Sequence, residues 1–286
     1  MATSSDALRT VTAVRYVTPL RGGGSVPGIV EADDLGTYVV KFTGSAQGRK
    51  ALVAEVIVGE LARQLGFRTP ELVLVQFDPA VAREEPHQEV QDLLRASAGL
   101  NLGVDHLPGA ADFTPGALDV DPAEAARIVW LDAFTANVDR TVHSPNLMTW
   151  PTSGHRPPRL WLIDHGAALV FHHRWADAAD AAGRAYDVRW HALGSRHLDL
   201  ETADADLAHR VTPELLRQVV AAVPDVWLAG EPGFSGPDEV REAYVRHLAA
   251  RAKLSDRWLL NGQAPPSEPC PQPATTLQCT AKQECG

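Results

Sequence analysis

Hydrophobic positions follow two different periods along this chain, and the change between them separates a strand-rich first part from a helix-rich second part. Runs rich in β-branched residues predict strands over 11–20, 28–32, 37–44 and 67–78. The turn DDLG joins the second and third of these strands as a hairpin. Apolar residues at helical spacing over 49–66, ending on a glycine, predict a helix before the last strand. We also expect helical structure in the acidic segment 79–98.

The second part of the chain carries mainly helical patterns. These predict helices from 121 to the loop NVDRTVHSPN, over 212–224 and over 236–261, with a strand in RLWLI between the first two. The glycine- and proline-rich segment 99–122 is the expected hinge. Strands and helices segregate rather than alternate, which predicts an α+β fold with two lobes and not a doubly wound sheet.

The expected boundaries follow from this segregation. A first lobe with an antiparallel sheet and one helix covers residues 1–105, and a mainly helical second lobe covers residues 106–262. Residues 263–286 are low in apolar content, and we expect this tail to be disordered.

The charge and the cysteine content limit which binding partners and which cellular compartment are expected. The 286 residues carry 26 basic and 36 acidic side chains, a net charge of −10, without a basic stripe, so no direct nucleic-acid partner is expected. No apolar run approaches the roughly 20 residues of a membrane span, and the first residues lack the pattern of a secretory signal. All three cysteines lie within the tail, which fits a reducing, cytoplasmic location.

A lysine inside an apolar strand is the first candidate for chemistry. The chain has four lysines, and Lys41 stands in the sequence YVVKF. A buried ammonium group is costly unless it is paired, so Lys41 either faces solvent or meets an anion. Glu55, inside the apolar run LVAEVIV of the predicted helix, is the expected partner. Glu60 is the alternative, although we expect it to be solvated.

A glycine cluster precedes the lysine strand. Gly22, Gly23, Gly24 and Ser25 bridge the first two predicted strands. Such a cluster is by itself most often an ordinary turn. Its position favours a second interpretation, in which backbone N–H groups and the Ser25 hydroxyl cover the phosphates of a nucleotide.

Two carboxylates and one amide provide the groups that phosphoryl transfer needs. Such a reaction requires a carboxylate that orients the attacking group, together with oxygen ligands for Mg²⁺. Asp139 can supply the first, and Asn146 and Asp164 can supply the ligands. Each of the three could instead cap a helix or a turn. Their order, downstream of the lysine and the helix glutamate, favours the functional interpretation.

This order of motifs resembles the protein-kinase-like fold. NVDRTVHSPNLMTW together with LWLIDHGAAL resembles, more narrowly, the HipA-like kinases of bacteria, and an arginine directly after the aspartate is also similar to phosphoinositide kinases. The resemblance implies ATP between the lobes with Lys41 on its phosphates. It implies a catalytic loop with Asp139 as base and Arg140 beside it, and Mg²⁺ on Asn146 and Asp164.

The motifs also depart from the kinase pattern. Asn146 follows Asp139 by seven positions, where kinases have five, and Asn137 and Val138 replace the usual His-Arg. The sequence DHG replaces the usual phenylalanine motif, and no Ala-Pro-Glu signature follows. These departures argue against a regulated kinase of the eukaryotic type.

The resemblance predicts an ATP- and Mg²⁺-dependent phosphotransferase that acts on a protein Ser/Thr or on a small-molecule hydroxyl. The motifs do not specify the acceptor of the phosphoryl group, and the chain's own tail is one candidate. A nucleotide-binding pseudokinase that acts as a toxin–antitoxin-like partner module is an alternative. Transfer of AMP on the same fold is another.

Overall fold

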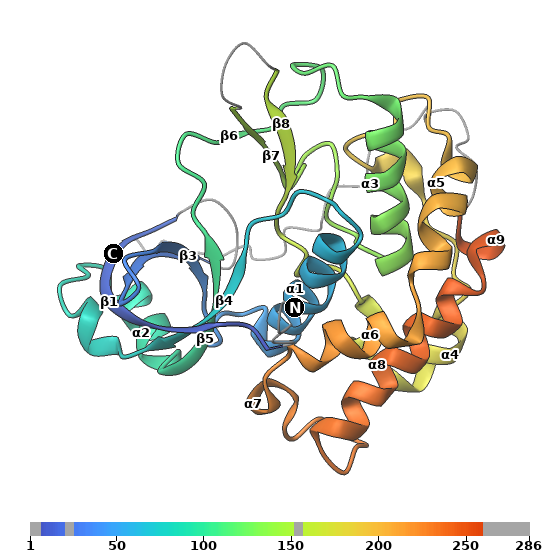
Figure 1. Cartoon of the computed structure of the whole chain (residues 1–286). Coiled ribbons are helices and arrows are strands. Elements are labelled where there is room, and N and C mark those ends of the chain that lie inside the picture. The colour runs from blue at the N-terminus through green and yellow to red at the C-terminus, as the bar shows by residue number, and fades with distance from the viewer. Residues whose placement is uncertain (1–6, 21–25, 152–156, 260–286) are drawn as a thin grey trace, which may run out of the picture.

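Five strands of the first lobe close into a barrel in the computed structural model, which describes residues 7–20, 26–151 and 157–259 (Figure 1). They are β1 (Thr10–Pro19), β2 (Gly28–Ala32), β3 (Thr37–Lys41), β4 (Leu72–Phe77) and β5 (Gly99–Asp105). Their order around the barrel is β1-β2-β3-β5-β4, and a parallel pairing of β1 with β4 closes it.

Strand β5 corrects the sequence prediction, which placed a hinge over 99–122. Gly103 lies in the middle of this strand, where a Cβ atom would come within 2.7 Å of the side chains of both Val73 and Val75 on β4. The glycine therefore permits close packing inside the barrel and does not mark a loop. The chain leaves the barrel only after Asp105.

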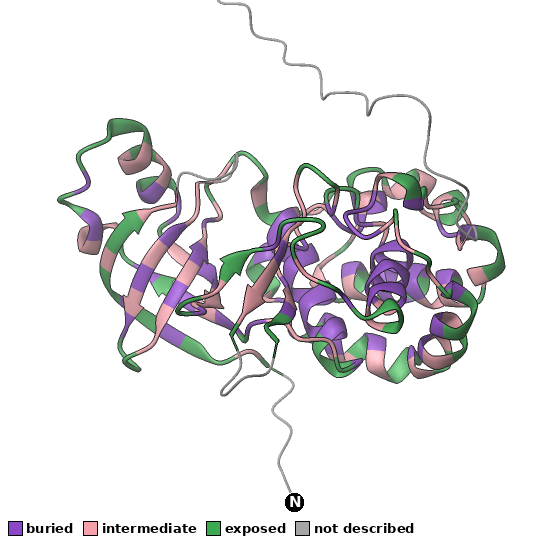
Figure 2. Cartoon of the chain, turned by 90° about the horizontal axis from the view of Figure 1, so that it is seen from above, coloured by how far each residue is buried: buried purple, intermediate pink, exposed green. Residues whose placement is uncertain are grey.

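Alternation along β3 points Lys41 away from the barrel interior. Tyr38, Val40 and Phe42 are buried inside the barrel, whereas Val39 and Lys41 are half-buried on the other face. Figure 2 shows this alternation as bands of buried and less buried positions along the strands. Lys41 therefore lies on the outer face of the barrel wall.

Helix α1 (Gly48–Gln64) lies between the barrel and the second lobe (Figure 1). Every residue from Ala51 to Ala62 is buried, as expected for a helix that is covered on all sides. Glu60, which we expected to be solvated, is buried as well and is ion-paired with Arg63. After β4, the segment expected to be helical contains η1 (Pro79–Ala82) and α2 (Gln88–Ala96).

The second lobe is mainly helical, with one small sheet. Its antiparallel sheet consists of β6 (Ala111–Asp112), β7 (Leu147–Trp150) and β8 (Arg159–Leu162). Its α-helices are α3 (Pro122–Thr135), α4 (Ala178–Ala181), α5 (Leu200–Leu207), α6 (Pro213–Ala221), α7 (Asp225–Leu228), α8 (Pro237–Ala252) and α9 (Ser255–Trp258). Single turns of 3₁₀ helix are η2 (Val170–His173), η3 (Trp175–Asp177), η4 (Val188–Trp190) and η5 (Ala208–Arg210).

The last predicted helix, 236–261, is divided in the structure. Helix α8 ends at Ala252, and Trp258 folds back so that its indole N–H donates to the Arg251 carbonyl at 2.7 Å. The indole ring also packs against Trp130 and Phe134 of α3. Burial of this large side chain therefore favours a break over a longer helix. None of the helices in the described ranges has the length and apolarity that a membrane span requires.

Candidate active site

The β7–β8 hairpin brings the two predicted metal ligands to one end of the small sheet. Leu147 pairs with Leu162, and the N–H of Ile163 donates to the carbonyl of Asn146 at 3.2 Å. Asn146 directly precedes β7, and Asp164 follows β8 by two residues. Both have left-handed backbone conformations, with φ of 47° and 54°, which Asn and Asp adopt more readily than most residues.

The catalytic-loop candidate Asp139 is exposed and lies beside Asn146. The Asn146 amide donates to the Asp139 carboxylate at 3.1 Å and to its carbonyl at 3.0 Å. The longer spacing between the two residues is taken up by a turn, in which the N–H of Thr141 donates to the Ser144 carbonyl at 2.9 Å. The Ser144 hydroxyl lies 3.4 Å from the Asp139 carboxylate. The departure from kinase spacing therefore leaves the aspartate and the asparagine in contact.

Lys41 connects the two lobes. It forms the predicted ion pair with Glu55, and its Nζ also lies 2.9 Å from Oδ1 of Asp164. Glu55 is only 2% exposed, so this lysine joins the barrel to α1 and to the loop after β8. Three charged groups from three segments thus meet at one point.

The pKa values in this cluster separate the roles of the two carboxylates. Burial opposes the charged form of Lys41, but the attraction of Glu55 and Asp164 outweighs it and raises the pKa of Lys41. Burial raises the pKa of Glu55 to about 7, because it outweighs the attraction of Lys41. The pKa of Asp164 lies well below its usual range despite burial, since Lys41 stabilises its anion. At neutral pH the lysine and Asp164 are charged, and Glu55 titrates.

Arg140 lies behind the catalytic loop with its guanidinium buried. It is 1% exposed and donates to the carboxylate of Asp132 at 2.6 Å and to the carbonyl of Ile163 at 3.1 Å. It also donates to the carbonyl of Asn146 and to Nδ1 of His165, the latter at 3.2 Å. The arginine therefore ties the loop that carries Asp139 to the loop that carries Asp164.

Asp132 and His191 complete this buried network, and sequence reasoning missed both. Asp132, 0% exposed, accepts hydrogen bonds from Asn137 at 2.9 Å, from Arg140 and from His191 at 3.0 Å. His191 Nδ1 accepts the N–H of Leu193, so Nε2 carries the proton that is donated to Asp132. Despite burial, Arg140 and His191 hold the pKa of Asp132 well below its usual range.

His165, between the candidate metal ligand and Arg140, is buried and neutral. Burial and the nearby Arg140 charge lower its pKa to about 3. Because Nδ1 accepts a hydrogen bond from Arg140, Nε2 carries the ring proton. The described residues contain no group of three or more His, Cys, Asp or Glu side chains that could hold a metal ion. Mg²⁺ usually takes one or two protein oxygens and completes its shell with phosphate and water, so the oxygen groups of Asn146 and Asp164 are of a suitable kind, and their role as metal ligands stays a prediction.

The glycine cluster, Gly22, Gly23, Gly24 and Ser25, lies outside the described residues, so its phosphate-binding role stays a prediction. The described chain on either side is joined by a hydrogen bond from the N–H of Leu20 to the carbonyl of Pro27, at 2.7 Å.

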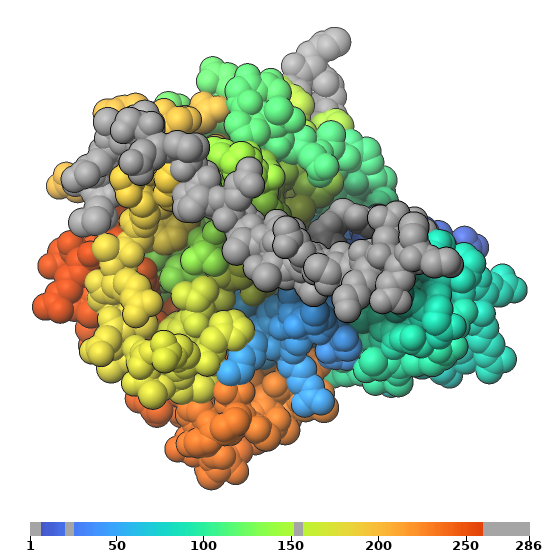
Figure 3. Space-filling model, turned by 180° about the vertical axis from the view of Figure 1, so that it is seen from behind, coloured from blue at the N-terminus to red at the C-terminus, as the bar shows by residue number. Residues whose placement is uncertain are grey.

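The start of α1 is held to the second lobe by a separate set of contacts. Lys50 donates to the His172 carbonyl at 2.6 Å and pairs with Glu231 at 2.7 Å. The indole N–H of Trp175 donates to the same carboxylate at 2.8 Å. Figure 3 shows the blue start of α1 meeting the yellow segment around 170–180 and the orange segment before α8 on one face. The helix that carries Glu55 is thereby fixed to the lobe that carries Asp164.

Together, the two-lobe α+β fold, the lysine–glutamate pair in contact with Asp164, and the loop that joins Asp139 to Asn146 define the class of protein-kinase-like proteins. The chain belongs to the HipA-like kinase family, whose model matches residues 14–260. The recognition of this family from the sequence motifs is confirmed.

Solved structures are similar to this chain in fold. The Helicobacter pylori proinflammatory kinase CtkA superimposes with a TM-score of 0.54 at 11% identity, over 88% of this chain and 95% of that one. The Golgi casein kinase with Mn/ADP bound gives a TM-score of 0.48 at 13% identity, over 88% and 73% of the two chains. No curated protein sequence matches the chain.

Proposed function

We propose that this protein transfers the γ-phosphoryl group of ATP to a hydroxyl group, with Mg²⁺ as cofactor. The observation that carries the proposal is the position of Lys41, shared between Glu55 of α1 and Asp164 of the second lobe. A lysine fixed between two carboxylates is positioned to meet the phosphates of a nucleotide between the lobes, while Asp164 remains ionised for a metal ion.

The remaining residues have distinct roles in this proposal. The exposed carboxylate of Asp139 orients the acceptor hydroxyl and takes its proton. Asn146 and Asp164 would hold Mg²⁺, which when bound neutralises charge that develops on the phosphates. The sequence analysis grouped Arg140 with the catalytic residues. In this proposal it is a positioning residue, because its guanidinium already donates hydrogen bonds to Asp132, to two carbonyls and to His165.

The experiment that tests the proposal compares ATP labelled at the γ phosphorus with ATP labelled at the α phosphorus. We expect incorporation or hydrolysis of the γ label, and a loss of at least about a hundredfold in Lys41→Met, because a preorganised positive charge on the phosphates is removed. Lys253→Met is the matched control, since Lys253 is exposed at the end of α8. The acceptor is sought in peptide and small-molecule mixtures with the same label.

Two results would overturn the proposal in different ways. Incorporation of the α label would identify an AMP transferase. Stabilisation of the protein against heat by ATP, with no turnover of either label, would identify a nucleotide-binding pseudokinase.

The rate should also depend on pH through Glu55, whose pKa is raised to about 7. Below pH 7 Glu55 takes up a proton and no longer balances Lys41, which is then held by Asp164 alone. We therefore expect kcat/KM to fall as the pH drops below about 7. Glu55→Gln should be slower at alkaline pH and should lack this acid limb. If kcat/KM of Glu55→Gln still falls below about pH 7 as in the unaltered protein, the titrating group is another one, such as the nucleotide.

A further inference from the structure

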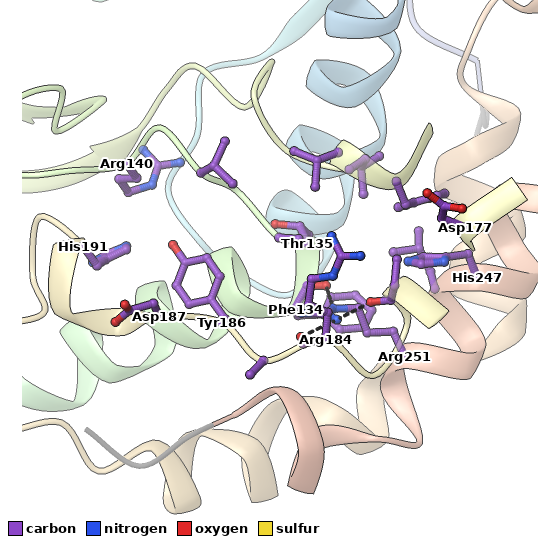
Figure 4. Close-up of a pocket in the computed structure, with 18 of the residues that line it drawn as sticks. Phe134, Thr135, Arg140, Asp177, Arg184, Tyr186, Asp187, His191, His247 and Arg251 are labelled. Atoms are coloured by element: carbon purple, nitrogen blue, oxygen red, sulfur yellow. Dashed lines mark hydrogen bonds between the residues drawn. The ribbon is translucent and has the colours of Figure 1, made fainter. Parts of the chain in front are cut away.

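A cavity of about 460 Å³ is lined by Val138, Arg140 and Thr141 of the catalytic loop, but not by Asp139 or Asn146. Its walls come from the end of α3, from the segments 138–141, 169–177 and 181–191, and from one face of α8. In Figure 4, Arg140 and His191 lie at one end and His247 and Arg251 at the other, with Tyr186 between them. The volume is within the range of about 300–1,000 Å³ that is typical of small-molecule sites.

The lining of the cavity has an excess of positive charge. Four arginines and two aspartates line it, and both aspartates already have partners, Asp177 with Arg174 at 3.5 Å and Asp187 with Arg189 at 2.6 Å. A second lining arginine, Arg140, is neutralised by Asp132.

The other two lining arginines, Arg184 and Arg251, are paired with no carboxylate among the described residues. Arg184 is exposed at the rim. The whole chain carries a net charge of −10, so the excess of positive charge in the cavity lining differs from the rest of the molecule.

Arg251 is buried and is held by carbonyl groups instead of an acid. It donates to the carbonyls of Ala133 and Phe134 at the end of α3, at 2.6 and 2.7 Å, and to those of Ala181, Ala182 and Arg184 at 3.0 to 3.2 Å. Burial lowers the pKa of Arg251 to about 10, so the guanidinium is still charged at neutral pH, and the C-terminal carbonyls of helices favour such a cation. The hydrogen bonds that hold Arg251 therefore fix a positive charge at this end of the cavity.

The floor of the cavity is apolar. Phe134, Leu169, Phe171 and Leu248 are all buried and line it. The ring of His247 stacks on Phe171 with the centroids 3.5 Å apart, and its Nδ1 donates to the Ala178 carbonyl at 2.8 Å. A ligand that fills this space would gain most from an apolar body.

We propose that the cavity binds a small organic anion, a carboxylate or a phosphate ester, whose apolar body lies on this floor and whose charged group meets Arg184 at the rim. Val138 and Thr141 of the catalytic loop form one wall, so the bound anion contacts the segment that carries Asp139. The proposal goes beyond phosphotransfer, because it assigns a second ligand with its own binding site.

Binding is tested by saturation-transfer NMR on the full chain, with four probes of similar body and different charge. These are phenylacetate and phenyl phosphate as anions, benzyl alcohol as the neutral analogue and benzylamine as the cation. We expect saturation transfer to at least one anion and none to benzylamine. No nucleotide is present, so the result is independent of whether the protein proves to be a kinase.

Two pairs of variants locate the bound anion. Arg184→Gln should lower the affinity for the anion by about tenfold, since a charge-assisted hydrogen bond is lost. Arg217→Gln, which changes an exposed arginine on α6, should leave this affinity unchanged. Ala185→Trp, at the exposed rim of the cavity, should block binding, whereas Ala176→Trp, exposed and outside the lining, should leave it intact. Equal binding of benzylamine and phenylacetate, or anion binding that neither Arg184→Gln nor Ala185→Trp reduces, would overturn the proposal.

Discussion

Asp139→Asn is expected to lower the phosphotransfer rate by about 10²–10⁴-fold, the usual contribution of a catalytic acid or base. The carboxylate is exposed, and its contacts in the described chain are with Asn146 and Ser144. An asparagine has the same shape and can still accept the Asn146 amide, so the loop should stay folded. Lys41 and Asp164 are untouched, and nucleotide affinity should therefore remain.

The measurement for Asp139→Asn combines single-turnover transfer of the γ label with the shift of Tm on adding ATP. Asp180→Asn, an exposed aspartate on α4, is the matched control and should behave as the unaltered protein. A normal transfer rate in Asp139→Asn would show that another group takes the proton. A loss of ATP-dependent stabilisation would instead assign Asp139 to nucleotide binding.

Asp132→Ala should lower the free energy of unfolding by about 3–5 kcal/mol, because it leaves the Arg140 charge buried without its partner. Asn137 and His191 lose their acceptor in the same change. Asp132 and Arg140 hold the segments around Asn146 and Ile163, so transfer should be lost as well. Denaturant unfolding at neutral pH measures the change in stability.

Asp206→Ala provides the matched control for Asp132→Ala. Asp206 is also paired with an arginine, Arg127, but its side chain is 44% exposed. Exposed ion pairs contribute at most about 1 kcal/mol, so the cost should be several-fold smaller. Equal losses in the two variants would mean that the buried network adds no stability beyond an ordinary surface pair.

The sequence contained enough to predict the α+β kinase-like fold and the contact at the centre of the site. An isolated lysine in an alternating strand and a glutamate in an apolar helix both required partners, and the structure pairs them. The same reasoning applied to Asp132, which stands in the apolar run IVWLDAF, would have identified a second buried acid. Its partner could not be found in the same way, because Arg140 directly follows an exposed aspartate and turns inward.

Other features depend on contacts that local patterns do not contain. Strand β5 pairs with β3 and β4, and Gly103, a residue type that usually indicates a loop, serves its close packing. His191 reaches Asp132 from a segment without helical or strand periodicity. The break between α8 and α9 depends on burial of Trp258 against α3. Each of these outcomes is decided by tertiary packing, which overrides local propensity.

The closed barrel also limits how another polypeptide can approach the first lobe. Each of its five strands has a neighbour on both sides, although β1 pairs with β4 only over residues 10–12, so the closed order leaves no strand at an edge of the sheet. A partner, or a second copy of the chain, therefore finds no edge strand of the barrel that it could extend. Within the described part of the molecule, the edge strands are β6 and β8, and the Leu162 N–H of β8 already donates to the Arg68 carbonyl at 2.8 Å. If a partner binds by adding a strand, the small sheet is therefore the expected place, and the hairpin of that sheet carries Asn146 and Asp164 at its end.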